Sequence, residues 1–166
     1  MDLSNHLISD WSSLQNQLVC ELGAGCGLVG IVAALLGAKE VLFTDYDPGA
    51  LQLIEDNIKA NCSPEGVFLA RAFRWGDEVT ALSSSRSDLL LGADLLYCVE
   101  VVEPLFLSVV QLLSSRGVFI LATSFSLGEN IDAEVARCTV KFKLRCEEVT
   151  PLSDKRSRIQ YFHFLV

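Results

Sequence analysis

The 166-residue chain has few of the residues from which metal sites and disulfide frameworks are built. It holds only two histidines, and its six cysteines are scattered without a single C-x-x-C pair. This spacing does not favour a zinc site, so we expect no bound metal. Several cysteines lie in apolar runs, where a free thiol behaves as a small apolar side chain. Reduced cysteines indicate a cytoplasmic location, with the nucleus as the alternative.

Long apolar runs and basic side chains are also scarce. No run reaches the 18 or so apolar residues of a membrane span, and the opening MDLSNHLISDWSS lacks the basic and apolar regions of a signal peptide. Thirteen Lys and Arg stand against 21 Asp and Glu, for a net charge of −8. Such a charge repels nucleic acid and attracts a Lys-containing protein segment, although it also simply keeps a protein in solution. We therefore expect a protein partner, no nucleic acid and no membrane.

Strand-like apolar runs alternate with helix-like segments along the chain. The sequence predicts strands at Leu18–Leu22, Glu40–Thr44, Val67–Trp75, Asp88–Leu96, Gly117–Thr123, Leu144–Val149 and Ile159–Leu165, and helices at Leu28–Leu36, 48–61, Val101–Leu113 and Ile131–Lys141. This order predicts a doubly wound α/β fold, with a mostly parallel seven-strand sheet and helices on both faces. About nine residues separate the last two strands, too few for a crossover helix, so these strands should form an antiparallel hairpin. We expect a single domain over residues 1–166.

The segment Glu21–Gly30, ELGAGCGLVG, contains two glycine motifs in overlapping registers. Gly23, Gly25 and Gly27 form G-x-G-x-G, whereas Gly25, Gly27 and Gly30 form G-x-G-x-x-G, the spacing of a dinucleotide fingerprint. The second register would extend the strand through Gly23 and leave the carboxylate of Glu21 inside the sheet, which is costly. The first register ends the strand beside Glu21 and leaves Gly30, like Gly27, for close packing of the helix.

In the first register the carboxylate of Glu21 emerges at the carboxyl edge of the sheet. An acid there repels a pyrophosphate and attracts an ammonium or a sulfonium. S-adenosylmethionine carries both cations and no phosphate, so Glu21, Gly23 and Gly25 are predicted to bind this cofactor. Asp45 ends the second strand, where an acid can bind ribose hydroxyls. Asp45 supports a nucleoside ligand without choosing between the two cofactors.

The stretch CELGAGCGLVGIVAALLGAKEVLFTDYDPGAL resembles the seven-strand class I methyltransferases, which have a Rossmann-like fold. It is most similar to methyltransferase family 16, the protein-lysine methyltransferase-like group. The resemblance covers about Leu18 to Leu113. It implies a methyltransferase that uses S-adenosylmethionine and methylates a lysine side chain of a protein.

Two further stretches carry the resemblance. In RWGD, Trp75 matches the aromatic residue of the family's D-W-G-like motif, which packs near the adenine, while Arg74 stands where the family usually has an acid. In GADLLYCVE, Asp94 and Tyr97 match the family's D-x-x-Y motif at the catalytic edge, and the preceding Ala93 is assigned to the cofactor site. The resemblance implies that Asp94 holds the lysine amine and that Tyr97 walls the acceptor channel. Without it, Trp75 can be a core residue and Asp94 a helix N-cap.

Three activities stay open on the sequence alone. The first is protein-lysine methylation, the second is methylation of a small molecule or another nitrogen, and the third is binding of S-adenosylmethionine with little catalysis. Family members usually have a longer N-terminal part with a V-W-P-like segment over the cofactor. Here about 17 residues precede the first strand, so we expect a short or truncated lid, with HLISDW as a helix against the sheet.

Overall fold

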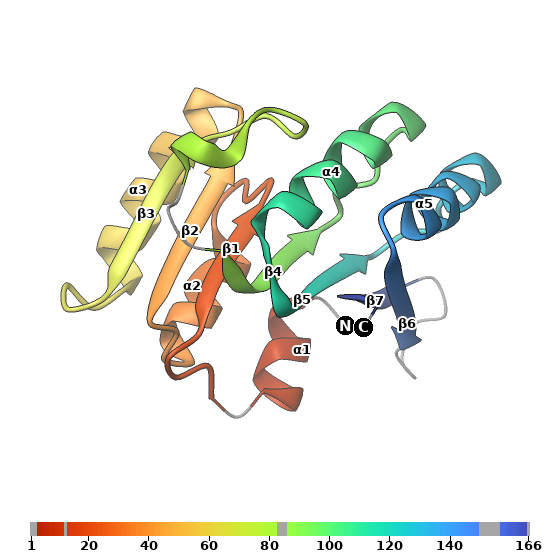
Figure 1. Cartoon of the computed structure of the whole chain (residues 1–166). Helices are drawn as coiled ribbons and strands as arrows, with labels where there is room; N and C mark the ends of the chain where they lie inside the picture. The colour runs from red at the N-terminus through yellow and green to blue at the C-terminus, as the bar shows by residue number, and fades with distance from the viewer. Residues whose placement is uncertain (1–2, 12, 83–85, 150–156, 166) are drawn as a thin grey trace.

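The computed structural model describes residues 3–11, 13–82, 86–149 and 157–165 and has one seven-stranded sheet between two layers of helices (Figure 1). Its elements are α1 (Leu3–Asp10), β1 (Leu18–Leu22), α2 (Leu28–Leu35), β2 (Glu40–Asp45), α3 (Pro48–Asn61), β3 (Val67–Ala72), the 3-10 turn η1 (Val79–Ala81), β4 (Ser87–Ala93), the 3-10 turn η2 (Val99–Val101), α4 (Val102–Leu112), β5 (Leu113–Thr123), α5 (Glu129–Lys141), β6 (Leu144–Val149) and β7 (Arg158–Phe164).

The strand order is β3-β2-β1-β4-β5-β7-β6. The first five strands in this order are parallel, and β7 is antiparallel to both of its neighbours. The predicted doubly wound sheet and its C-terminal hairpin are confirmed. The insertion of β7 between β5 and β6 was not predicted. Its physical reason is burial, because β7 contributes Ile159 and Phe162 to the core whereas β6 buries only Leu144 and suits the edge.

Helices α1, α2 and α3 cover one face of the sheet, and α4 and α5 cover the other (Figure 1). Strands β1, β2, β4 and β5 are mostly buried, as in parallel sheets covered on both faces, whereas the edge strands β3 and β6 are mostly half-buried or exposed. On the α4–α5 face, the rings of Phe106, Phe119 and Phe162 form a mutual contact with centroids 5.1–6.4 Å apart. Among the described residues, no helix is long and apolar enough to cross a membrane.

The N-terminal segment forms the expected helix against the sheet. Helix α1 buries Leu3 and Leu7, and Trp11 packs against the same core. The buried imidazole of His6 bonds the hydroxyl of Tyr161 on β7 through Nε2. This bond joins the first helix to the last strand of the sheet.

Two strands end earlier than the sequence predicts. β3 ends at Ala72 and β4 at Ala93, so that Trp75 and Asp94 lie in the turns that follow. Asp94, the first residue after β4, has φ 56°, a left-handed conformation that ends the strand, and Gly76 has φ 93° in the turn that follows Trp75. The predicted polar connection after β3 contains the short turn η1, while residues 83–85 and most of the charged turn 153–158 lie outside the described residues.

Candidate active site

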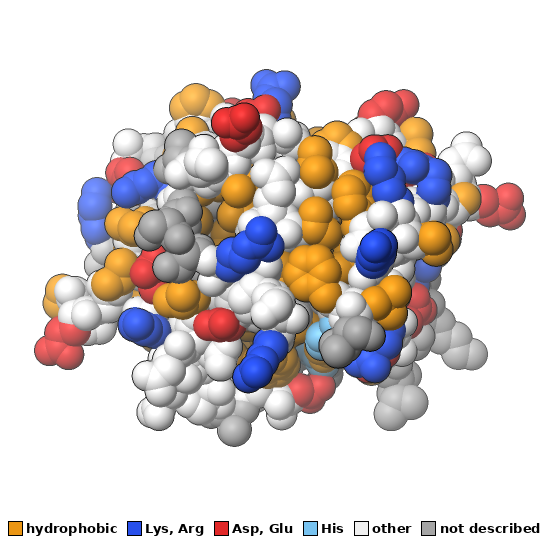
Figure 2. Space-filling view, in the orientation of Figure 1, with side chains coloured by type: hydrophobic (Ala, Val, Ile, Leu, Met, Phe, Trp, Pro, Cys, Tyr) orange, Lys and Arg blue, Asp and Glu red, His pale blue; other side chains and the backbone are white. Residues whose placement is uncertain are grey.

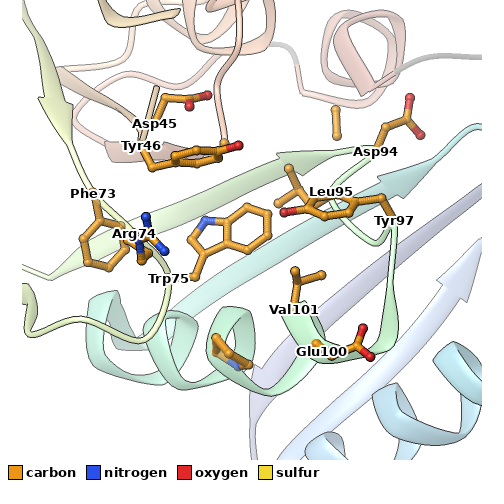
Figure 3. Close-up of a pocket in the computed structure, with 13 residues that line it drawn as sticks. Asp45, Tyr46, Phe73, Arg74, Trp75, Asp94, Leu95, Tyr97, Glu100 and Val101 are labelled. Carbon is orange, nitrogen blue, oxygen red and sulfur yellow. The ribbon is translucent and has the colours of Figure 1, made fainter. Parts of the chain in front are cut away.

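A cleft of about 550 Å³ opens at the carboxyl edge of the sheet, between the turns that follow β1 to β4 and the start of α4 (Figure 3). It is lined by Gly23, Asp45, Tyr46, Phe73, Arg74, Trp75, Ala93, Asp94, Leu95, Tyr97, Glu100, Val101 and Pro104. Figure 3 shows Asp45 and Asp94 at opposite ends, with the indole of Trp75 on the floor between them. This is the edge where ligands bind in open α/β sheets.

The glycine loop, residues 23–27, follows the G-x-G-x-G register. Gly23, Gly25 and Gly27 all have positive φ, at 58°, 57° and 79°, and Gly27 is the N-cap of α2. Gly30 is helical and serves packing, because a Cβ there would lie 2.3 Å from Cε1 of Phe43. The loop therefore needs the first three glycines for its turn and the fourth for the approach of α2 to β2.

Glu21 lies beneath the glycine loop, not at an open edge. Its side chain is only 4% exposed, and its Oε2 accepts the N–H of Gly30 at 2.9 Å, while Val29 donates a second bond from the same helix end. The predicted placement of this carboxylate is therefore wrong. A pyrophosphate is disfavoured for a different reason. It would bind the free N–H groups at the N-terminus of α2, and two of these groups already donate to Glu21.

Burial raises the pKa of Glu21 to about 8, from 4.5, against the opposing effect of its bonds to Gly30 and Val29. The folded chain then holds a proton that the unfolded chain releases above about pH 4.5. The proton on Glu21 therefore contributes to the free energy of unfolding. This contribution is complete below pH 4.5, and the free energy of unfolding falls by about 1.4 kcal/mol per pH unit as the pH rises from there to about 8.

Glu21→Gln should therefore unfold with less dependence on pH than the wild type. The amide keeps an oxygen for the N–H of Gly30 but has no proton to release. Urea unfolding of both proteins at pH 5.5 and 7.5 measures the difference. We expect the wild type to lose more free energy of unfolding over this interval than the variant, and equal losses would contradict the burial effect.

Asp45 lines the cleft at the end of β2 and is 9% exposed. Its Oδ2 accepts the N–H of Gly25 at 2.9 Å, and its Oδ1 accepts that of Asp47 at 3.0 Å. A carboxylate has about four lone-pair sites, so two bonds fix its orientation and leave capacity for hydroxyl donors. Gly25 itself does not line the cleft and acts on it through Asp45.

Trp75 and Tyr46 present aromatic faces at the Asp45 end of the cleft (Figure 3). The indole packs against the core below and stands opposite Gly23, where a Cβ would lie 2.9 Å from Cζ2 of Trp75. Tyr46 is 65% exposed, and the guanidinium of Arg74 lies 5.8 Å from its ring centroid. Arg74, which replaces the family's usual acid, therefore lies over one face of the Tyr46 ring in a cation–π contact.

The turn after Trp75 is tied to α4 by Ser108. The hydroxyl of Ser108 is fully buried, accepts the N–H of Gly76 at 2.8 Å and donates to the carbonyl of Pro104 at 3.0 Å. A buried hydroxyl is tolerated only when it is bonded, and here it satisfies an N–H that the turn would leave unpaired. The position of the indole thus depends on a helix far away in the sequence.

Asp94 and Tyr97 form the other end of the cleft, after β4. Both oxygens of the exposed Asp94 side chain bind Ser124, the residue that follows β5. The predicted alternative for Asp94, a helix N-cap, does not occur. Tyr97 is 63% exposed, and its hydroxyl points into the cleft (Figure 3). Partial burial, with a smaller effect from Tyr46, raises the pKa of Tyr97, so its hydroxyl keeps its proton at neutral pH.

The sequence predicted about half of the residues that line the cleft. Six predicted residues line it: Gly23, Asp45, Trp75, Ala93, Asp94 and Tyr97. Glu21 and Gly25 do not line the cleft: Glu21 bonds the N-terminus of α2, and Gly25 donates its N–H to Asp45. Tyr46 and Leu95 were missed, although each directly follows a predicted site residue at a strand end.

Glu100 lies at the mouth of the cleft, where hydrogen bonds from its own backbone and from Cys98 lower the pKa of its carboxyl.

A second cluster of acidic and sulfur groups lies between α4 and α5. Within the described part of the chain, Glu103, Glu134 and Cys138 are close enough to share a cation. Arg137 and Lys141 already pair with these carboxylates, and Figure 2 shows acidic and basic side chains together over this side of the molecule. We interpret the cluster as an ion-pair network between the two helices.

Comparison with known proteins places the chain among methyltransferases. Solved structures share its fold, among them the ribosomal protein L11 methylase of Lactobacillus delbrueckii subsp. bulgaricus, with a TM-score of 0.74 and 17% identity over 98% of this chain and 77% of that one. The magnesium protoporphyrin IX methyltransferase of Synechocystis, solved with bound SAH, gives a TM-score of 0.72 and 16% identity, over 98% and 80%. These likenesses establish the Rossmann-like methyltransferase fold.

The sequence profile described as lysine methyltransferase matches residues 3–132, and the chain belongs to this family. It is 39% identical to the protein N-lysine methyltransferase METTL21A of Xenopus tropicalis, over 73% of this chain and 55% of that protein. It is 38% identical to the EEF1A lysine methyltransferase 3 of Mus musculus, over 74% and 52%. The chain therefore spans about half the length of the curated relatives it matches.

Proposed function

We propose that the chain binds S-adenosylmethionine and methylates a lysine side chain of a protein. The observation that carries this proposal is the separation of two chemically different ends in one cleft. One end has aromatic faces and a carboxylate, Asp45, and the other has a second carboxylate, Asp94, beside the hydroxyl of Tyr97. The first end suits a nucleoside and the second suits a cationic amine.

The residues of the first end fit the cofactor. Trp75 offers an indole face for adenine, worth about 1 kcal/mol beyond the area that it buries. Asp45 has lone pairs left for ribose hydroxyls. Gly23 lines the cleft, and its lack of a side chain lets Trp75 and Leu95 lie close to the backbone there. Tyr46 supplies a second aromatic wall. When bound, S-adenosylmethionine supplies an activated methyl group on a positively charged sulfur.

At the second end, Asp94 holds and aims the lysine amine. A lysine has a pKa near 10.4 and must lose one proton before its nitrogen can accept a methyl group. Burial in a narrow channel lowers that pKa, whereas the charge of Asp94 raises it. Asp94 therefore serves binding and orientation, Tyr97 walls the channel, and desolvation favours loss of the proton.

The substrate is best sought among proteins. The net charge of −8 and the carboxylates of Asp94 and Glu100 at the cleft favour a basic protein segment over nucleic acid. All six cysteines are free, which supports a reducing compartment, the cytoplasm or the nucleus. We take residues 1–166 as one methyltransferase domain.

Two measurements test the proposal. Calorimetry should show binding of S-adenosylmethionine and none of NAD, and the reverse result would overturn the cofactor assignment. Cell lysate is then incubated with the protein and with methyl-labelled cofactor. Label on a protein band, lost when lysines are blocked by acetylation, supports the proposal. Label only on small molecules supports the second activity, and binding without label supports a non-catalytic binding module.

A further inference from the structure

Asp94 has a backbone conformation that aspartate adopts infrequently. It is one of three non-glycine residues with positive φ in the described chain, at 56°. This conformation is unfavourable by roughly 1 kcal/mol for a side chain with a Cβ, although Asp and Asn tolerate it better than most. The first residue after β4 is therefore held in place by contacts elsewhere.

Those contacts come from the end of the neighbouring strand. The N–H of Asp94 donates to the carbonyl of Ala122 at 2.9 Å, which continues the parallel pairing of β4 with β5 by one residue. The N–H of Ser124 then donates to Oδ1 of Asp94 at 2.7 Å, and the hydroxyl of Ser124 donates to Oδ2 at 2.9 Å. One residue thus binds both oxygens of the carboxylate.

The consequence is a carboxylate with a fixed direction. Two donors on two different oxygens define the plane and rotation of the group, and charge-assisted bonds of this kind are short and strong. Because an ionised carboxylate has about four lone-pair sites, roughly two are left for an outside donor. The cleft then offers an amine a limited set of approach directions to Asp94.

We propose that Ser124 is a positioning residue for the acceptor amine, acting through Asp94. This inference rests on the proposed function, because it needs Asp94 to hold the amine. Ser124 is not a lining residue of the cleft and belongs to a segment that no sequence motif marked. Its hydroxyl orients the carboxylate, and its loss lets the side chain of Asp94 rotate. Cofactor binding, at the opposite end of the cleft, does not depend on it.

The test compares three variants with the wild type: Ser124→Ala, Ser124→Thr, and Ser126→Ala as a matched control. Ser126 is exposed in the same loop and makes no hydrogen bond with Asp94. Transfer from labelled S-adenosylmethionine is measured at increasing concentrations of size-fractionated lysate protein, and cofactor affinity is measured by calorimetry. Ser124→Ala should lower the apparent kcat/KM for lysate protein about tenfold at unchanged cofactor affinity.

Ser124→Thr, which keeps the hydroxyl, should retain most of the transfer, and Ser126→Ala should equal the wild type. If Ser124→Ala transfers as well as Ser126→Ala, the inference is overturned. If the wild type itself transfers nothing to protein, the proposed function fails. The effect of Ser124 on the orientation of Asp94 can still be tested by crystallography. Crystal structures of the wild type and Ser124→Ala should then differ in the side-chain rotamer of Asp94. An unmoved carboxylate refutes the positioning role.

Discussion

Asp94→Asn is expected to reduce methyl transfer to protein lysine at least a hundredfold while leaving the affinity for S-adenosylmethionine within about twofold. Asparagine has the same shape and tolerates the left-handed backbone at φ 56°. Its oxygen can still accept the N–H of Ser124. What disappears is the negative charge that binds and aims the amine. Labelled transfer to lysate protein and calorimetry with the cofactor measure the two effects separately.

A matched control removes a carboxylate by the same substitution elsewhere. Asp56 on α3 is exposed, pairs with Lys59 and does not line the cleft, so Asp56→Asn should transfer like the wild type. Asp94→Asn activity close to that of Asp56→Asn would show that the charge of Asp94 is not needed for transfer. Equal losses of cofactor affinity and transfer would instead indicate that Asp94 serves the cofactor.

The order of strands and helices could be predicted because each element carries its own pattern. Continuous apolar runs marked the buried parallel strands. The helix predicted at 48–61 has its signals at its own start, because proline suits the first helical position and the carboxylate of Asp47 accepts the N–H of Ala50. The position of β7 could not be predicted in this way. It depends on how Phe162 packs against Phe106 and Phe119, which are distant in sequence.

In the candidate site, too, features with a local sequence pattern could be predicted, and features that depend on contacts between distant residues could not. Residues at strand ends, such as Asp45 and Asp94, could be predicted because parallel strands bring their carboxyl ends to one edge. The direction of a side chain could not: Glu21 turns under the loop to the N-terminus of α2, where helix N–H groups attract an acid. Ser108 and Ser124 carry no sequence signal, because their roles exist only through contacts with Gly76 and Asp94.

Gly23→Ala is expected to lower the affinity for S-adenosylmethionine at least a hundredfold. The backbone there has φ 58°, and a Cβ would lie 2.9 Å both from Cζ2 of Trp75 and from Cδ2 of Leu95. Contacts this short force the two side chains to move, and Trp75 is the platform proposed for the adenine. The indole shift removes the aromatic face and narrows the cleft at the same time. Calorimetry with the cofactor measures the loss.

Gly25→Ala separates this collision from backbone strain. Gly25 has nearly the same φ, 57°, but a Cβ there would meet nothing within 4 Å. Both variants should therefore lose about 1 kcal/mol of stability from the left-handed conformation, and Gly23→Ala should lose more. Gly25→Ala should keep most of its cofactor affinity, because its N–H still bonds Asp45. If both variants lost cofactor affinity equally, loop strain rather than displacement of Trp75 would govern binding, and Trp75 would no longer be the residue that makes Gly23 necessary.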